Sequence, residues 1–307
     1  MRRVDCIIVG GGPAGTFCAS TLAEHSISCA LVERRASMEG KVCGGGISRY
    51  GVQVLNRIGF PVDLLLSYGI KVERSINLLE NGTVVEDRWK DTAHKADYAI
   101  GIARDDLDAI FLRSAISHGV IVQLGCSVAR VEQSDGLYVA GDFTAPIMVL
   151  ACGATNSLVP AAITTREQLP FGVSALYQSS MPQPGMFVFD YSDAYADGYA
   201  WIFSIGTHKW NVGVWSRNPH PDMKALFQHF AQTRMPQLIG VDAVCIQIPK
   251  GAFIGTRKNA EKLGNGFYIA GDAAGSAKLS SGEGIPQAIL SGIRVAQSIL
   301  NDLSGIA

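Results

Sequence analysis

Three glycines near the start of the chain have the spacing that a dinucleotide phosphate requires. Gly10, Gly12 and Gly15 form a G-x-G-x-x-G pattern between an apolar run and a segment of helical character. The first glycine permits a tight turn, the second lets the backbone approach a pyrophosphate, and the third allows a helix and a strand to pack closely. Pro13 and Ala14 lie in the same turn, where the amides of a helix N-terminus would hold the phosphates.

An acidic residue completes this pattern. Glu33 ends the next apolar run, where its carboxylate can accept hydrogen bonds from a ribose. A carboxylate here disfavours a nucleotide with a 2′-phosphate, although the neighbouring Arg34 and Arg35 leave binding of such a nucleotide open. We expect Arg34 to contact the cofactor. The alternative interpretation is a glycine turn followed by a solvated Glu33. We favour dinucleotide binding, because the strand, the helix and the acid stand in the required order.

The elements that must position these residues form a β-α-β unit. Residues 4–9 and 28–33 suit buried parallel strands, and residues 16–24 suit the helix between them. A right-handed crossover joins such strands. Similar elements recur later, with strands expected at 120–124, 147–151 and 266–271 and helices expected at 48–59, 105–118 and 282–300.

Segments of a different character lie between these elements. Asn81-Gly82 and Asp135-Gly136 predict tight hairpins, and residues 171–216 contain alternating stretches rich in aromatic side chains. The sequence therefore predicts an α/β fold, in which a Rossmann-type domain is interleaved with an antiparallel-β substrate domain. The expected division is 1–69, 101–165 and 251–307 for the first domain, and 70–100 and 166–250 for the second.

The composition excludes several classes of protein. The net charge of −1 gives no reason to expect nucleic acid or an anionic membrane surface as a partner. The seven cysteines show neither a CxxC pair nor a Cys/His metal spacing, so we expect no disulfide framework, no metal site and a reducing cytoplasm. A membrane-spanning helix needs about 20 apolar residues, and no uninterrupted run of that length is present.

A second glycine-rich motif indicates which dinucleotide is bound. Residues 266–275 form a strand that runs into Gly271-Asp272, and Gly282, Gly284 and Ile285 follow before a helix. This motif resembles the second FAD fingerprint of glutathione-reductase-type flavoproteins, particularly those with the aromatic-hydroxylase architecture. The resemblance implies that Asp272 binds the ribityl chain of FAD and that the later glycines lie near the flavin ring. The alternative for Asp272 is a helix N-cap.

An arginine motif adds to this resemblance. Arg104 and Asp108 match the Arg-x-x-Leu-Asp start of a helix in the same proteins, in which the arginine contacts FAD. The alternative is a surface ion pair between residues four apart, which would contribute only a few tenths of a kcal/mol.

Two further motifs resemble the geranylgeranyl reductase family. Residues 41–48, with Cys43 and Gly44, match the motif that lies beside the flavin in relatives. Residues 198–203 are similar to the family's substrate-domain motif, which implies that Tyr199, Trp201 and Phe203 line the substrate cavity. The chain resembles a short form of this family and departs from its motifs at Ser204 and at residues 278–281, where relatives carry prolines.

The resemblance implies an FAD-dependent oxidoreductase that acts on a hydrophobic small molecule. The expected reaction is reduction of a carbon–carbon double bond by hydride transfer from reduced flavin. One alternative is a monooxygenase that hydroxylates or epoxidises its substrate through a flavin C4a-hydroperoxide, and another is a non-catalytic, FAD-binding maturation partner. Cys43 is the only catalytic candidate, and the alternative for it is a small apolar residue at a turn.

The sequence leaves the identity of the electron donor open. No second G-x-G-x-x-G pattern follows a predicted strand, so we expect no separate NAD(P)H domain. Transient binding of NAD(P)H and reduction by a donor protein are both compatible with the sequence.

Overall fold

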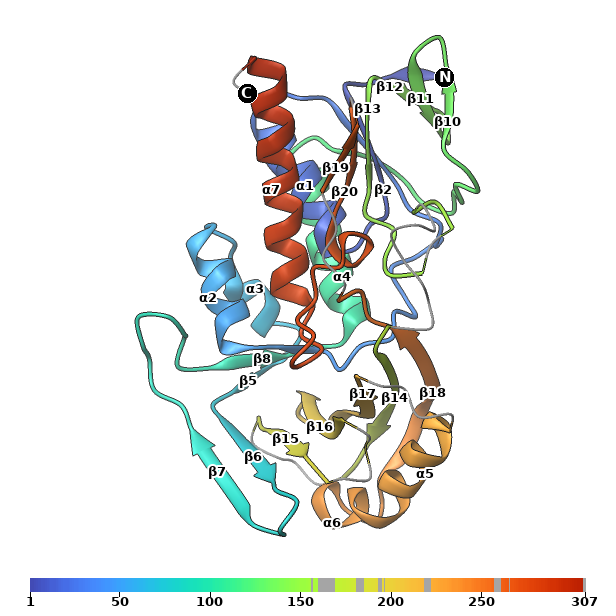
Figure 1. The fold of residues 1–307 in the computed structure, drawn as a ribbon. Helices are drawn as coiled ribbons and strands as arrows, with labels where there is room; N and C mark the ends of the chain where they lie inside the picture. Colours follow the sequence, from blue (N-terminus) through green and yellow to red (C-terminus); the bar gives the residue numbers. More distant parts are fainter. Residues whose placement is uncertain are drawn as a thin grey trace.

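A six-stranded sheet forms the centre of the half of the molecule that holds both ends of the chain (Figure 1). The computed structural model describes residues 1–155, 157–159, 169–180, 185–192, 195, 197–217, 222–256, 261–264 and 266–305. Neighbouring strands of this sheet are parallel, except that the edge strand is antiparallel to its neighbour. In order across the sheet, the strands are β19 (Lys262–Gly264), β20 (Phe267–Ile269), β13 (Ile147–Leu150), β2 (Cys6–Val9), β3 (Cys29–Val32) and β9 (Ile121–Gln123).

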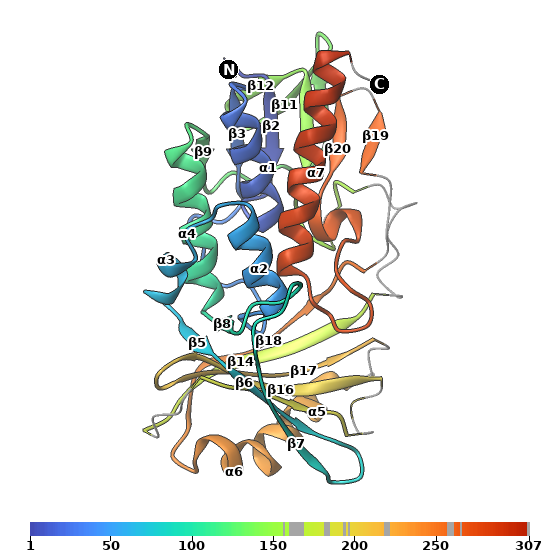
Figure 2. The same cartoon turned by 90° about the vertical axis from the view of Figure 1, so that its left-hand side faces the viewer.

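Three helices cover one face of this sheet (Figure 2), namely α1 (Pro13–Glu24), α4 (Arg104–Ser117) and α7 (Ile285–Ser304). Helices α1 and α7 pack closely, because a Cβ atom at Gly292 would lie only 2.2 Å from the carbonyl oxygen of Ala14. The helix predicted after the glycine pattern is confirmed, but it begins at Pro13 rather than at residue 16. Proline is favourable at the first position of a helix, where its missing amide costs no hydrogen bond.

A small four-stranded sheet packs on the other face of the central sheet. Tyr138 and Phe143 from this small sheet join a buried cluster with Ile7 and Met148 of the central sheet. The hairpin predicted at Asp135-Gly136 is confirmed, since both residues adopt the positive φ angles of a tight turn. The strands in order are β1 (Arg2–Arg3), β12 (Phe143–Ala145), β11 (Leu137–Ala140) and β10 (Glu132–Ser134).

A seven-stranded sheet forms the other half of the molecule. All neighbouring strands are antiparallel except one pair, β15 and β6, which is parallel. The hairpin predicted at Asn81-Gly82 is confirmed as the connection between the last two strands. In order across the sheet, the strands are β18 (Val244–Phe253), β14 (Phe171–Gln178), β17 (Lys209–Ser216), β16 (Gly198–Gly206), β15 (Phe187–Asp190), β6 (Arg74–Leu78) and β7 (Val84–Arg88).

Two helices close the face of this sheet that points away from the nucleotide-binding half (Figure 1), namely α5 (Met223–Thr233) and α6 (Met235–Ile239). Phe227 and Phe230 of α5 are buried against Val212 and Val214 of the sheet. The aromatic side chains on the opposite face of the sheet therefore point toward the nucleotide-binding half, because side chains alternate along a strand.

A short three-stranded sheet joins the two halves. Its strands are β4 (Gly46–Ile47), β8 (Ala99–Gly101) and β5 (Ile70–Val72), with α2 (Arg49–Arg57) and α3 (Val62–Leu66) beside them. A Cβ atom at Gly101 would overlap the carbonyl oxygen of Ser204, at 1.6 Å, so β8 lies directly against β16. Two of the proposed domain boundaries, after residues 100 and 250, fall inside β8 and β18.

Within the described residues, no helix has the length and apolar character needed to cross a bilayer.

Candidate functional site

The three glycines of the N-terminal pattern have different surroundings. Gly10 has a φ of +115°, and a Cβ atom there would lie 2.3 Å from the carbonyl oxygen of Ala151. A Cβ atom at Gly15 would lie 1.9 Å from the carbonyl oxygen of Gly10. By contrast, a Cβ atom at Gly12 would meet nothing within 4 Å. Packing within the protein thus explains Gly10 and Gly15, whereas Gly12 faces open space at the N-terminus of α1, where a pyrophosphate fits.

Glu33 lies at the end of β3 beside this turn. Its carboxylate accepts hydrogen bonds from the amide of Gly11 at 2.8 Å, and from the amide and Nε of Arg35 at 3.0 and 2.9 Å. Burial disfavours the charged form of Glu33, but the hydrogen bonds from Arg35 and Gly11 outweigh it and lower its pKa below the ordinary value. Glu33 is therefore an ionised acceptor at neutral pH. Arg35 pairs with this carboxylate, whereas the Arg34 side chain is exposed.

Arg104 and Asp108 form an ion pair in the first turns of α4. Arg104 Nη2 lies 2.7 Å from Asp108 Oδ1, and the two side chains are 8% and 0% exposed. The alternative of a surface pair is therefore wrong. Burial opposes the charge of Arg104, but the nearby Asp108 carboxylate and Cys43 outweigh it and raise the pKa of the guanidinium. Arg35 Nη2 lies 3.9 Å from the other carboxylate oxygen of Asp108.

Asp272 lies in a 3₁₀ turn, Gly271–Ala274, that directly follows β20. The N-cap residue of this turn is Ala270, so Asp272 is not the helix cap considered as its alternative role. A Cβ atom at Gly271 would lie 2.7 Å from Ala14 Cβ, and one at Gly284 would lie 3.6 Å from Asp272 Oδ1. The two glycine motifs, which are far apart in the sequence, thus meet at one place.

Burial raises the pKa of Asp272 above its ordinary value, against the opposing effects of Lys41, the Gly255 amide and Arg104. A half-buried carboxyl group that is only partly compensated by neighbouring charges is suited to a polar ligand such as the ribityl chain. Lys41 and Arg104 lie close enough to Asp272 to lower its pKa, so the motif at residues 41–48 contributes to the same site.

Replacing Asp272 by asparagine is expected to flatten the pH dependence of stability in the FAD-free protein. Because its pKa is raised on folding, the native state binds the carboxyl proton more tightly than the unfolded chain does. The free energy of unfolding therefore falls as the pH rises from the ordinary aspartate range through the folded pKa. Asp272→Asn cannot lose that proton, so its free energy of unfolding should fall less. Urea denaturation of both proteins from acidic to neutral pH tests this, and identical profiles would contradict it.

The segment before α7 contacts three other elements, namely β16, α2 and β17. Tyr199 of β16 donates to the carbonyl oxygen of Ser281 at 2.8 Å, and Glu283 accepts from the hydroxyl of Ser48, the N-cap residue of α2. Gly282 has a φ of +67°, and a Cβ atom there would lie 2.9 Å from Nε1 of Trp215. Gly284 is the N-cap residue of α7. Ile285 follows it with its side chain buried in the core, so only its backbone can face a ligand.

The three aromatic residues predicted to line a substrate cavity lie on one face of β16. Tyr199, Trp201 and Phe203 point toward the nucleotide-binding half and pack with Phe187 and Trp215. The rings are in close contact, with centroids 4.4 Å apart for Phe187 and Phe203 and 5.3 Å apart for Tyr199 and Trp215. We refer to Tyr199, Trp201, Phe203, Phe187 and Phe189 as the aromatic wall.

The motif at residues 41–48 packs directly against this wall. A Cβ atom at Gly44 would lie 3.1 Å from the Phe203 ring and 3.2 Å from Trp201 Nε1. The candidate cofactor residues Cys43 and Gly44 and the candidate substrate residues Trp201 and Phe203 therefore lie next to one another.

Asn211 is a site residue that sequence reasoning missed. Its Oδ1 accepts from Trp201 Nε1 at 2.8 Å, and its Nδ2 donates to the carbonyl oxygen of Cys43 at 2.7 Å. Asn211 thus fixes the Cys43 loop to the aromatic wall. The only signal in the sequence is a lone amide within the apolar strand 210–215, and a buried amide generally has hydrogen-bond partners.

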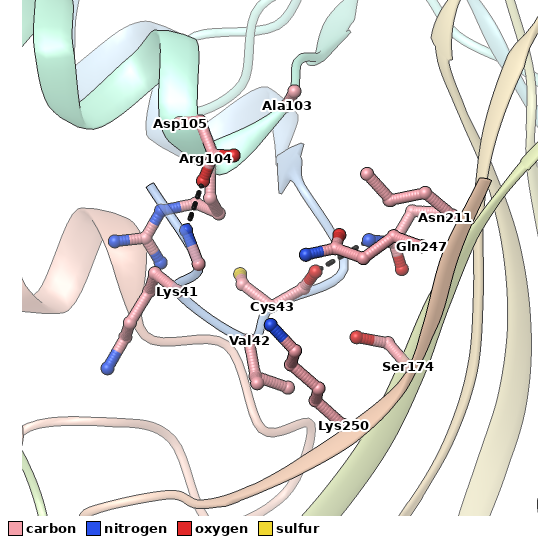
Figure 3. Close-up of a pocket in the computed structure, with 12 residues that line it drawn as sticks. Lys41, Val42, Cys43, Ala103, Arg104, Asp105, Ser174, Asn211, Gln247 and Lys250 are labelled. Atoms are coloured by element: carbon pink, nitrogen blue, oxygen red, sulfur yellow. Dashed lines mark hydrogen bonds between the residues drawn. The ribbon is translucent and has the colours of Figure 1, made fainter. Parts of the chain in front are cut away.

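A small cavity of about 20 Å³ that is partly open to solvent lies beside Asn211 and the Cys43 loop (Figure 3). Polar side chains from β14 and β18 meet the Cys43 loop and the start of α4 there. Asp105, the one acidic residue in the lining, accepts a hydrogen bond from the Gly40 amide at 2.9 Å. The lining residues are Gly40, Lys41, Val42, Cys43, Ala103, Arg104, Asp105, Ser174, Leu176, Asn211, Gln247 and Lys250.

Comparisons with known proteins support the same cofactor. Residues 3–142 match the family model described as an FAD binding domain. A curated digeranylgeranylglycerophospholipid reductase from Methanoculleus marisnigri is 23% identical, over 96% of this chain and 76% of its own length. The prediction of an FAD-binding domain is therefore confirmed.

Solved structures share the fold. A geranylgeranyl bacteriochlorophyll reductase-like protein from Thermoplasma acidophilum superposes with a TM-score of 0.84 at 21% identity, over 100% of this chain and 80% of that chain. A myxobacterial chondrochloren halogenase, described as FAD-dependent, gives a TM-score of 0.81 at 18% identity, over 100% and 76% of the two chains. These similarities confirm the predicted fold class, a Rossmann-type half interleaved with a β-rich half.

Proposed function

We propose that this chain, an FAD-dependent oxidoreductase that resembles the geranylgeranyl reductase family, reduces a carbon–carbon double bond of a hydrophobic isoprenoid. The observation that carries this proposal is the contact of the Cys43-Gly44 loop with Trp201 and Phe203. A buried cluster of aromatic side chains beside the expected flavin position is an apolar environment that suits a hydrocarbon chain. The curated relative's name, a prenyl-lipid reductase, favours the same chemistry.

We assign the following roles in FAD binding to residues of the chain. Gly12 and the N-terminus of α1 hold the FAD pyrophosphate, Glu33 binds the ribose, and Asp272 binds the ribityl chain. Arg104, Gly282 and Gly284 complete the cofactor contacts. When bound and reduced, FAD supplies the hydride, while the protein supplies position and an environment without water.

Tyr199 and Cys43 are the two groups that could deliver the proton that accompanies hydride transfer. Burial raises the pKa of Tyr199 well above its ordinary value, so this phenol stays neutral and keeps its hydrogen bond to Ser281. The Cys43 thiol lines the same cavity as Arg104, on the loop that contacts Trp201 and Phe203. We therefore assign the delivery of the proton to Cys43 Sγ.

The electron donor and cellular location belong to the same proposal. A transient complex with NAD(P)H or with a donor protein would reduce the flavin. All seven cysteines are free thiols, as a reducing cytoplasm would keep them.

The test is anaerobic mixing of the reduced protein with geranylgeraniol, followed by flavin absorbance and mass spectrometry of the product. We expect the flavin to become oxidised without oxygen, and the product to gain two hydrogens. Cys43→Ala should retain FAD and slow this oxidation. A product that gains an oxygen atom, formed only in air, would instead establish the monooxygenase alternative, because the fold is shared by both chemistries. No ligand-dependent change of the flavin under either condition would favour the non-catalytic alternative.

A further inference from the structure

A backbone segment crosses the aromatic wall at each of its ends. Tyr199 and Phe203 lie four residues apart on one face of β16, which separates them by about 13 Å along the strand. At the Phe203 end, a Cβ atom at Gly46 would lie 3.2 Å from the phenyl ring, so the motif at residues 41–48 covers this end. At the other end, the Tyr199 hydroxyl donates to the carbonyl oxygen of Ser281. An elongated ligand that lies along the wall therefore meets one of these segments at each end.

Trp215 of β17 fills the space at the Tyr199 end. The two residues pair directly across the strands, and their ring centroids are 5.3 Å apart. The Trp215 side chain is buried, with only 3% of the residue exposed. A Cβ atom at Gly282 would lie 2.9 Å from both Cε2 and Nε1 of the indole, and one at Gly172 would lie 3.8 Å from its Cδ1. The indole thus occupies the volume between β14, β16 and the segment before α7.

The backbone that Trp215 contacts is held by hydrogen bonds of its own. The amide of Gly282 donates to the carbonyl oxygen of Lys278 at 2.8 Å, and the amide of Lys278 donates to the carbonyl oxygen of Glu283 at 2.9 Å. The side chains of Lys278 and Glu283 also form an ion pair at 2.6 Å. The φ angle of Gly282, +67°, suits a glycine, and the indole leaves no room for a larger residue. Trp215 is therefore enclosed between a sheet and a closed turn.

Hydrogen bonding distinguishes Trp215 from its neighbour Trp201. The Nε1 atom of Trp201 donates to Asn211 Oδ1 at 2.8 Å, and the same amide holds the Cys43 carbonyl. Within the described residues, the Nε1 atom of Trp215 is buried and has no hydrogen-bond partner. Trp215 thus contributes volume and packing contacts, whereas Trp201 also holds a polar group. A smaller residue at 215 leaves no buried acceptor unpaired, so its effect is a change of shape.

We propose that Trp215 is a specificity-determining residue, which stops an elongated apolar substrate at the Tyr199 end of the aromatic wall. The inference rests on the proposed function, since it concerns the isoprenoid placed along this wall. A chain that cannot pass the indole enters to a fixed depth, so a single double bond reaches the place beside the Cys43 loop. Its π bond breaks, one carbon gains the hydride that reduced FAD supplies, and the other gains a proton. The site therefore selects one position along the chain.

The first test is binding to the FAD-loaded, full-length protein with its flavin oxidised, so that no turnover occurs. Calorimetry would give dissociation constants of geraniol, farnesol and geranylgeraniol for the wild type and for Trp215→Ala. Each buried methylene strengthens binding about fourfold. We expect the wild-type affinity to stop rising once the chain reaches the indole, and to continue rising in the variant. Geranylgeraniol should bind Trp215→Ala at least about tenfold more tightly than it binds the wild type.

The second test is the product formed from geranylgeraniol by the reduced proteins without oxygen. The wild type should reduce one double bond at one position, whereas Trp215→Ala should reduce a second position, as mass spectrometry and NMR would show. Trp215→Phe keeps an aromatic ring and a filled core, and should change binding and product in the same direction by a smaller amount. Trp210→Phe is its matched control, because Trp210 is a buried indole of the same strand that packs with the α5 side of the sheet. It should change neither result.

Every other outcome has a definite meaning. An equal rise in affinity from farnesol to geranylgeraniol in the wild type and in Trp215→Ala, or the same products from both, would overturn the role of Trp215. If the alcohols bind but neither protein reduces them, the proposed reduction fails, and the binding series alone decides on Trp215. If no alcohol binds either protein, the proposed function fails, and naphthalene becomes the probe, because a dry apolar cavity binds such molecules. Naphthalene binding to Trp215→Ala alone would support the filled end of the wall, and binding to neither protein would overturn it.

Discussion

Replacing Gly12 by valine is expected to give a folded protein that purifies without FAD. The backbone at Gly12 has a φ of −76°, which any residue can adopt, and a Cβ atom there would meet nothing within 4 Å. The protein alone therefore tolerates the side chain. A pyrophosphate that approaches this backbone does not, because the valine would occupy its space and separate it from the amides of α1. Losing two charge-assisted hydrogen bonds, at about 1.5–3 kcal/mol each, lowers affinity by at least about a hundredfold.

The matched control for this prediction is Gly15→Ala in the same turn. A Cβ atom at Gly15 would lie 1.9 Å from the carbonyl oxygen of Gly10, so even the smallest side chain forces α1 away from β2. This variant should lose stability whether or not FAD is present. The flavin-to-protein absorbance ratio measures retention, and thermal unfolding of the FAD-free proteins measures stability. A yellow Gly12→Val protein with the wild-type ratio would show that the phosphates lie elsewhere.

The features that the sequence predicted well depend on local backbone requirements. The glycine turn, the Asn81-Gly82 and Asp135-Gly136 hairpins and the helix after Ser48 each follow from residues close together in the chain. Their conformations are fixed by φ angles and capping groups, which a short segment contains in full.

The features that the sequence did not predict depend on register between distant strands. Asn211 acquires its role only because β17 places it opposite Phe203, where its side chain also reaches the Cys43 carbonyl. Gln247 and Lys250 reach the same cavity because β18 pairs with β14 through two irregular shifts of register. A one-residue change of register moves a side chain to the other face of a sheet, so alternation in the sequence cannot assign these residues to the site.

The sequence also did not predict that the charged residues at the start of α4 are buried. The four-residue spacing of Arg104 and Asp108 predicted an ion pair, but not that both side chains are removed from solvent. It also gave no sign that Arg35 reaches Asp108 and Glu33 together. These contacts link the proposed ribose contact at Glu33 to Arg104 through Arg35 and Asp108. We infer that a change at Arg104 affects both ends of the FAD site.

Replacing Arg104 by methionine is therefore expected to lower the free energy of unfolding by about 3–5 kcal/mol, the usual cost of leaving one charge of a buried pair uncompensated. The carboxylate of Asp108 would keep only Arg35, at 3.9 Å, as a cation. The double variant Arg104→Met/Asp108→Leu should recover much of the loss, because no buried charge remains. Lys71→Met, which breaks the exposed pair with Glu73, is the control and should cost less than about 1 kcal/mol.

Urea denaturation of the FAD-free proteins measures these differences in stability, and FAD titration of the same samples measures binding. If the single variant is as stable as the wild type but binds FAD weakly, then Arg104 serves the cofactor alone and the ion pair contributes little to the fold. If stability falls and the double variant restores it while FAD binding stays weak, then one arginine serves both purposes. The second result is the one expected, because the Arg104 guanidinium contacts Asp108 and also lines a cavity with Cys43 of the loop that borders the expected flavin position.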